Sequence, residues 1–241
     1  FPWPTPPPAE AVAAAMRRLQ ALGALKGAEA LGSKAAGANA IRCTQLGFRL
    51  AALPVAPRYA KMLLAAVSGA EDGKSHIIGH ACALVAALSV GNLINPEALT
   101  ALGDDDVEDG PREGENELIR AEREAKRRLR EAQSREAPRW TQLKDDADGL
   151  LWLMGGYAWA ASVSEERAES FCRECRANSR QLAEAHSLMQ QLGSLLQRRL
   201  SLGAAGIELE MPLRPKPPTP AQAQKLRSCV VEGLIDRVAV C

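Results

Sequence analysis

The chain has 241 residues, of which 46% are hydrophobic, 24% charged and only 4% aromatic, with a net charge of +1. This composition is typical of a soluble globular protein, and the small net charge excludes a global attraction to nucleic acid or membranes, so any such affinity must come from local patches. No run of about eighteen apolar residues suggests a membrane span. The six scattered cysteines favour a reducing compartment, and abundant alanine and leucine favour a mainly α fold.

Residues 1–70 contain the parts of a winged-helix module, in a scrambled order. Apolar spacing, caps and breakers predict these parts. They are, in order, a helix capped by Thr5 with Pro6 at its first position and Gly23 after its end, a loop over 24–40, a short strand over 40–44, a helix over 44–53 capped by Thr44, and a helix over 57–67.

Residues 71–205 are predicted to form a helical bundle. The segment 77–90 is apolar nearly all round, which is typical of a helix buried on most sides, and Asn95 with Pro96 is expected to end it. Three further helices are predicted from their apolar faces. These faces are Leu150, Met154, Tyr157 and Ala161; then Ala168, Phe171, Cys172 and Cys175; then Leu182, Ala185, Met189, Leu192 and Leu196.

A charged insertion over 103–139 interrupts the bundle. It begins with an acidic block and continues with a basic stretch that includes residues 126–130. Such patterns usually form solvated surface segments. A phosphate-contacting or nuclear-import role for the basic stretch is the alternative.

Residues 206–241 are predicted to be a proline linker followed by one helix. Thr219 and Gln222 form a capping box, with Pro220 at the first helical position. Leu226, Val230 and Leu234 share a face of this helix. Since the chain begins without Met and stops without closing structure, we expect a piece of a longer protein or a processed product.

The sequence SGAEDGKSH, residues 68–76, resembles a nucleotide site but does not meet its requirements. A phosphate-binding loop needs four residues between its first glycine and the Gly-Lys pair, whereas Gly69 and Gly73 enclose only three. A helix, and not a strand, is predicted before it. We therefore expect a polar turn between two helices, with Lys74 outside any nucleotide site.

Other residue types suited to chemistry are better explained by packing and capping. Cys172 and Cys175 form a C-x-x-C pair, but no second close pair of Cys or His completes a zinc site. Three acids before a predicted helix suit capping, and the histidines are too dispersed for catalysis. These residues are Asp145, Asp146 and Asp148, and His76, His80 and His186. We expect no catalytic residue, metal or cofactor site in this chain.

One cationic strip is a candidate for binding RNA. Arg173, Arg176 and Arg180 project from about one side of a predicted helix, with Asn178 close by. Phosphate contacts supply much of the affinity for nucleic acid. A solvated helix face is the simpler interpretation, and both stay open.

Several segments resemble, in the right order, the region beyond the two motor domains of DEAH-box RNA helicases. They are FPWPTPPPAEAVAAAMRRLQALGAL (1–25), LAALPVAPRYAKMLL (50–64), ALVAALSVGNLINP (83–96), DGLLWLMGGYAW (148–159) and FCRECRANSRQLAEAHSLMQQL (171–192). The start FPWPTPP, the segment VAPRYAKML, the insertion ending in Trp140 and the segment 217–239 look most like the nucleolar branch that acts in small-ribosomal-subunit assembly.

The resemblance implies a winged helix followed by a ratchet-like bundle, with the OB-fold missing or only begun. It implies a part of the RNA channel of an enzyme that translocates 3′ to 5′ on RNA, with ATP and Mg²⁺ bound in motor domains outside this chain. The chain alone is then expected to be inactive. The implied partners are single-stranded RNA (pre-rRNA or small nucleolar RNA), the motor and OB domains and ribosome-assembly proteins, in the nucleolus of the nucleus and without a membrane.

The candidate RNA contacts of this chain are Arg173, Asn178 and Arg180, of which Asn178 and Arg180 are comparable with the family and Arg173 comes from the cationic strip. Gly149, Arg176 and Met189 depart from the family's pattern, so contacts are not carried over to those positions. Two other function classes stay open. One is a non-enzymatic helical scaffold or protein-interaction module, and the other, poorer one is a free-standing winged-helix DNA binder.

Overall fold

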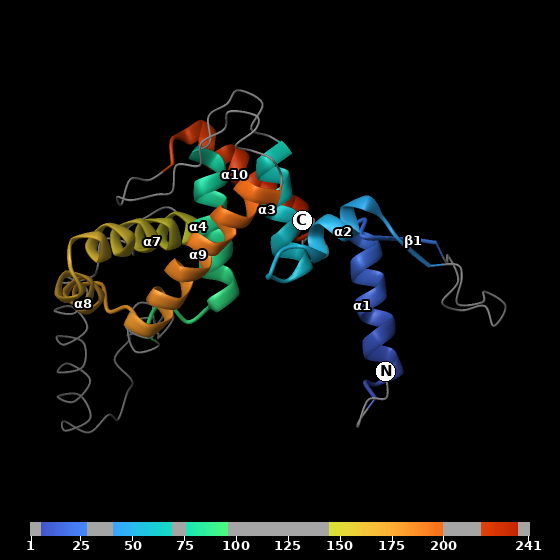
Figure 1. Ribbon diagram of the computed structural model, residues 1–241, viewed down its shortest axis with the longest axis horizontal. Coiled ribbons are helices and arrows are strands. Elements are labelled where there is room, and N and C mark those ends of the chain that lie inside the picture. Colours follow the sequence, from blue (N-terminus) through green and yellow to red (C-terminus); the bar gives the residue numbers. More distant parts are fainter. Residues whose placement is uncertain (1–5, 28–40, 69–75, 96–144, 200–217, 236–241) are drawn as a thin grey trace, which may run out of the picture. The chain divides into compact units, whose positions relative to one another are not determined.

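The computed structural model describes residues 6–27, 41–68, 76–95, 145–199 and 218–235 (Figure 1). These ranges are helical apart from short connections and one two-stranded ladder, which confirms the mainly α class. Contacts divide the chain into two compact units. The first comprises Phe1–Ser89, Leu188–Met211 and Pro218–Cys241, and the second comprises Val90–Ser187 and Pro212–Pro217. None of the described helices combines the length and apolar character that crossing a membrane requires.

The first unit begins with helix α1 (Ala9–Ala21). Gly23 follows it with a φ of 78°, a left-handed conformation that glycine adopts at low cost after a helix. The predicted stop is therefore confirmed, but the predicted start is wrong, since Pro6 is not helical. Each of Pro7 and Pro8 disfavours helical backbone in the residue before it. Thr5 lies outside the described residues.

A short antiparallel ladder follows α1. Strand β1 (Leu25–Lys26) pairs with β2 (Arg42–Cys43), so that Leu25 faces Cys43 and Lys26 faces Arg42. The strand predicted over 40–44 is confirmed. The loop predicted over 24–40 is wrong at its start, because β1 obtains its hydrogen-bonding partner from a segment distant in sequence.

Two predicted helices, α2 (Gln45–Ala51) and α3 (Pro57–Ser68), come next. The buried residues of α3 are Ala60, Met62, Leu63, Leu64 and Ala66. Helix α10 (Pro220–Gly233) packs against α3, and a Cβ on Gly233 would lie 2.6 Å from the carbonyl oxygen of Arg58. Glycine thus allows the two helices to approach closely. The predicted capping box of α10 is confirmed, with reciprocal bonds between Thr219 and Gln222.

Helix α4 (His76–Val90) is buried on most sides, as predicted. It ends five residues before Asn95, because Gly91 and Asn92 adopt positive φ values of 69° and 49°. Glycine and asparagine are the residues that tolerate this conformation best. The predicted end at Asn95 is therefore wrong.

The second unit contains α7 (Asp146–Val163), α8 (Glu165–Glu174) and the first part of α9 (Ser179–Arg199). The faces predicted for α8 and α9 are confirmed as buried. The face predicted for α7 is confirmed at Met154, which is buried, and wrong at Ala161, which is exposed. Leu151 and Leu153, which lie outside the predicted face, are buried as well. Helix α7 packs on more than one side, and the ring of Phe171 lies against Gly156.

Several predictions lie outside what the structure tests. The turn over 69–75 and the insertion over 103–139 lie outside the described residues. The winged helix and the domain boundaries 1–70, 71–205 and 206–241 stay predictions.

Candidate nucleic-acid interface

The predicted RNA contacts surround the turn between α8 and α9. Cys175 ends α8, and Arg176 follows with a φ of 52°. This left-handed conformation costs a non-glycine residue roughly 1–3 kcal/mol. The turn closes with a hydrogen bond from the Ala177 amide to the carbonyl of Cys172, at 2.8 Å.

A segment about eighty residues earlier in the chain holds this turn in place. The Asn178 amide donates to the carbonyl of Leu93 at 2.8 Å, and the Asn95 amide donates to the carbonyl of Arg176 at 3.1 Å. Ile94 and Ala177 form an antiparallel bridge between these bonds. The backbone on which the arginines stand is therefore fixed from two sides, which compensates the strain at Arg176.

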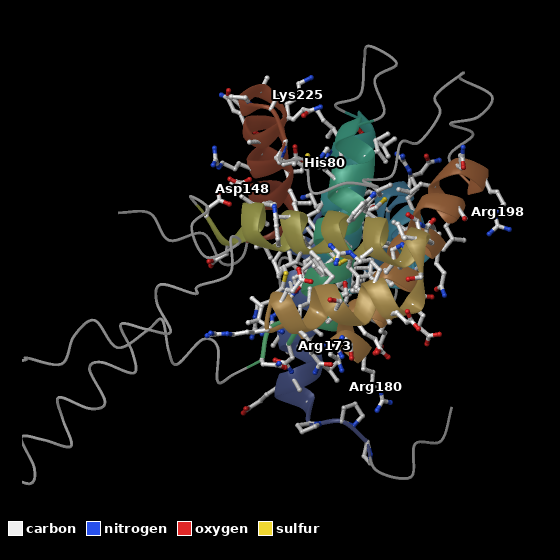
Figure 2. All side chains as sticks on the ribbon, turned by 90° about the vertical axis from the view of Figure 1, so that its left-hand side faces the viewer. His80, Asp148, Arg173, Arg180, Arg198 and Lys225 are labelled. Atoms are coloured by element: carbon white, nitrogen blue, oxygen red, sulfur yellow. The ribbon has the colours of Figure 1, made fainter. Side chains whose placement is uncertain are left out.

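The three predicted contact residues have different environments. Arg173 at the end of α8 and Arg180 at the start of α9 are both exposed, and Figure 2 shows them near the junction of the two helices. Asn178 is half-buried, and its Oδ1 accepts a hydrogen bond from the Gln181 amide at 3.3 Å. Asn178 thus caps α9, and contact of any of the three with RNA stays a prediction.

The acid at this turn is already engaged. A carboxylate oxygen of Glu174 lies 3.5 Å from the Arg167 guanidinium and accepts a hydrogen bond from Ser170 Oγ at 2.9 Å. The guanidinium of Arg167 also lies 5.9 Å from the ring centroid of Trp159. Arg173 and Arg180 take part in neither interaction, so both can present their charge to a ligand.

Charge is distributed unevenly between the two units. The described residues of the second unit contain eight acids and four arginines, whereas those of the first contain eleven Lys or Arg and two Glu. The net charge of +1 conceals this excess of cations in the first unit. A signal was present, since residues 30–70 carry five bases and no acid.

The two thiols of the C-x-x-C pair, Cys172 and Cys175, are buried. Burial raises the pKa of Cys172 to about 11 and that of Cys175 to about 12, with nearby glutamates adding to both shifts. Both thiols therefore stay protonated near neutral pH, although thiolates are the reactive and metal-binding form. The packing role predicted for this pair is confirmed. Within the described ranges, no three His, Cys, Asp or Glu residues gather as a metal site would require.

The other polar candidates also have structural roles. Asp145 Oδ1 accepts a hydrogen bond from the Asp148 amide at 2.8 Å, which confirms the predicted cap of α7. The ring of His186 packs edge-on against Tyr157, with centroids 5.7 Å apart. Burial lowers the pKa of His186 and raises that of Tyr157.

A cavity of about 360 Å³ lies in the first unit. Its wall is almost entirely apolar, and Phe48 at its edge is 67% exposed. The lining residues are Phe48, Arg49, Ala52, Leu53, Leu64, Leu195 and Leu196. Such a wall suits an apolar side chain, and it offers a phosphate only Arg49.

Comparison with known proteins gives one family and several relatives. Residues 56–151 match the helicase associated domain (HA2), ratchet-like. The chain is 32% identical to the probable ATP-dependent RNA helicase kurz of Drosophila melanogaster, over 99% of this chain and 17% of the relative. It is 33% identical to the probable ATP-dependent RNA helicase DHX37 of Homo sapiens, over 99% of this chain and 19% of the relative.

A more distant relative matches along the same extent. The probable ATP-dependent RNA helicase DHR1 of Saccharomyces cerevisiae is 26% identical, over 100% of this chain and 18% of the relative. The chain thus spans less than a fifth of the length of these curated relatives.

Proposed function

We propose that this chain forms one wall of an RNA channel. Residues 56–151 match the ratchet-like helicase associated domain, and 99% of the chain aligns with ATP-dependent RNA helicases. In this role it contacts single-stranded RNA and couples motor closure to 3′–5′ translocation. ATP and Mg²⁺ belong to the motor domains of the parent enzyme and not to these residues.

The observation that carries the proposal is the pair of exposed arginines on a fixed turn. Arg173 and Arg180 flank a backbone held by the bonds to residues 93–95, so little order has to be gained when RNA binds. Arginine donates to phosphate in a planar fork, and contacts of this kind position the strand without reading its sequence. Sequence-independent contact is what translocation along RNA requires.

Coupling to the motor has a candidate element in α9. The helix is continuous from Ser179 to Arg199, and its residues from Leu188 onward belong to the first unit. In this proposal, displacement of RNA at the turn is transmitted along this continuous helix. Asn178 caps this helix. Its role in the proposal is to hold the first turn of α9 beside the RNA strand.

We further propose a role in processing small-subunit rRNA in the nucleolus. Support comes from the resemblance of FPWPTPP and of residues 217–239 to the nucleolar branch, and from the similarity to DHX37 and DHR1. The substrates in this proposal are pre-rRNA or small nucleolar RNA. The partners are the motor and OB domains and ribosome-assembly proteins.

The first test measures RNA binding by the 241-residue chain. We expect a fluorescein-labelled oligo-uridine of about twenty nucleotides to bind at low salt, as measured by fluorescence anisotropy. Arg173→Ala with Arg180→Ala should weaken binding several-fold and reduce the slope of log K against log salt by about 1.4, because each phosphate contact to a single strand contributes about 0.7.

Arg198→Ala is the matched control for this test. Arg198 is an exposed arginine on the same helix, and its Nε donates to the carbonyl of Ser194. It stands eighteen residues beyond Arg180, or about 27 Å along the axis at 1.5 Å per residue. Equal losses from the control and the double variant would contradict a contact at the α8–α9 turn.

The rival function is a non-enzymatic scaffold that binds protein. The exposed Phe48 beside an apolar cavity is the observation that favours it. Binding of RNA that depends on salt and on Arg180 supports the helicase role. Absence of any RNA binding at low salt would favour the scaffold.

A further inference from the structure

Two like charges stand opposite each other in the ladder of the first unit. Lys26 and Arg42 are cross-strand partners, and both side chains are exposed. Directly opposed side chains in an antiparallel pair have Cβ atoms about 5 Å apart, so like charges there destabilise the pairing. No described carboxylate forms an ion pair with either residue. The repulsion is therefore uncompensated within the described part of the chain, and an anionic ligand would relieve it.

Helix α1 adds a third cation to this pair. Gln20 Nε2 donates to the carbonyl of Gly27 at 2.8 Å, which ties the last turn of α1 to the residue after Lys26. Arg17 lies three residues before Gln20 and hence on the same face of the helix. Its side chain is exposed, and Figure 1 shows β1 leaving the end of α1. We call Arg17, Lys26 and Arg42 the α1–hairpin surface.

The scaffold under the α1–hairpin surface is rigid. Thr44 Oγ1 donates to the carbonyl of Gly23 at 2.7 Å, and the Thr44 amide donates to the carbonyl of Ala24 at 2.9 Å. These bonds join the end of α1 to the residue after β2. Together with the Gln20 bond, they hold the backbone that carries the three cations, and the cationic side chains themselves stay exposed.

Few acids oppose this surface. The described part of the first unit contains only Glu10 and Glu232. Glu10 stands seven residues before Arg17, or about 10 Å along the helix. Residues 28–40 add one acid, Glu29, and one base, Lys34, so they leave the balance unchanged.

We propose that the α1–hairpin surface binds the phosphate backbone of RNA, as a second contact separate from the α8–α9 turn. Three cationic side chains on one hydrogen-bonded backbone match the repeated charges of a phosphodiester chain, and none of the three residues is aromatic and could stack on a base. Binding is therefore sequence-independent and sensitive to salt. The choice of RNA among polyanions rests on the proposed function.

The test replaces the opposed pair in the 241-residue chain by Lys26→Gln with Arg42→Gln. We expect several-fold weaker binding of oligo-uridine at low salt and a salt slope smaller by about 1.4. The substitution also removes the repulsion between Lys26 and Arg42, so the melting temperature of the variant should be at least as high as that of the parent. Loss of RNA binding then cannot be attributed to unfolding.

Arg49→Gln with Lys61→Gln is the matched control, since it removes the same charge from α2 and α3 of the same unit. Its affinity for RNA should stay within about twofold of the parent. An equal loss would mean that RNA responds only to net charge, and it would overturn the inference. An unchanged affinity in the Lys26 and Arg42 variant would overturn it as well.

Two further measurements separate the possible ligands and sites. Poly-glutamate that binds as tightly as the oligo-uridine, with the same dependence on Lys26 and Arg42, would show an acidic-protein site and overturn the RNA assignment. If Arg173→Ala with Arg180→Ala has no effect while the hairpin variant weakens RNA binding, the contact proposed at the turn fails and this inference stands. If instead the Arg173 and Arg180 variant weakens RNA binding and the Lys26 and Arg42 variant does not, the inference of a second contact fails and the contact proposed at the turn stands.

Discussion

His186 is a half-buried imidazole whose environment favours its neutral form. It packs against the ring of Tyr157, and burial lowers its pKa below the ordinary value of 6.5. A charged imidazole would lose hydration there, and the cause of the shift is desolvation. The side chain therefore links the packing of α7 and α9 in the second unit to pH.

We predict that the second unit loses stability as the pH falls through about 6.5. Below that pH the unfolded chain binds a proton at His186 that the folded chain does not, so protons favour unfolding until the folded pKa is reached. His186→Phe keeps a ring against Tyr157 and removes this titration. Urea unfolding at pH 8 and pH 5 should show a smaller acid loss in the variant, and identical losses would contradict a neutral His186.

At the scale of elements, Thr44 joins two pieces of structure. Its Oγ1 accepts a hydrogen bond from the Gly47 amide at 3.0 Å as the cap of α2, and it donates to the carbonyl of Gly23 after α1. Removing a cap of this type costs about 1 kcal/mol, and the second hydrogen bond adds a similar amount. We predict that Thr44→Ala lowers the free energy of unfolding by roughly 1–2 kcal/mol.

Thr44→Ser supplies the control, because serine retains the hydroxyl and caps at least as well. Denaturant unfolding should place Thr44→Ser near the parent. If serine costs as much as alanine, the methyl group and not the hydroxyl carries the effect.

Elements fixed by local chemistry could be predicted from the sequence. The caps at Thr44, Asp145 and Thr219 each involve a backbone amide three residues away, so a short window contains the whole interaction. The buried faces of α8 and α9 follow helical periodicity, which is also visible in a short window.

Elements that depend on distant segments could not be predicted in this way. Strand β1 forms only because Arg42 and Cys43 pair with it. The burial of α7 depends on what surrounds it, including Phe171 against Gly156. The hydrogen bonds that hold the α8–α9 turn come from residues 93–95, and no sequence pattern near Arg176 indicates them. The candidate contacts were thus found as residue types, while their fixed geometry came only from the fold.

For the whole molecule, the small net charge conceals two units of opposite character. Cations exceed acids in the described part of the first unit, and acids exceed cations in that of the second. We therefore expect the first unit to attract a polyanion more strongly than the second, in which the arginines of the α8–α9 turn are a local exception. The composition does not indicate this difference, because the net charge of the whole chain is +1.

The last prediction concerns catalysis by the whole chain. A phosphate-binding loop wraps phosphates with the backbone amides of a four-residue spacer before Gly-Lys, and Gly69 to Gly73 is one residue too short for that loop. No Asp-Glu-Ala-His sequence occurs among the 241 residues. We therefore expect the purified chain to show no ATP hydrolysis, with or without oligo-uridine, in an assay of phosphate release. Lys74→Ala should change nothing, and turnover that this substitution abolishes would place a nucleotide site in this region after all.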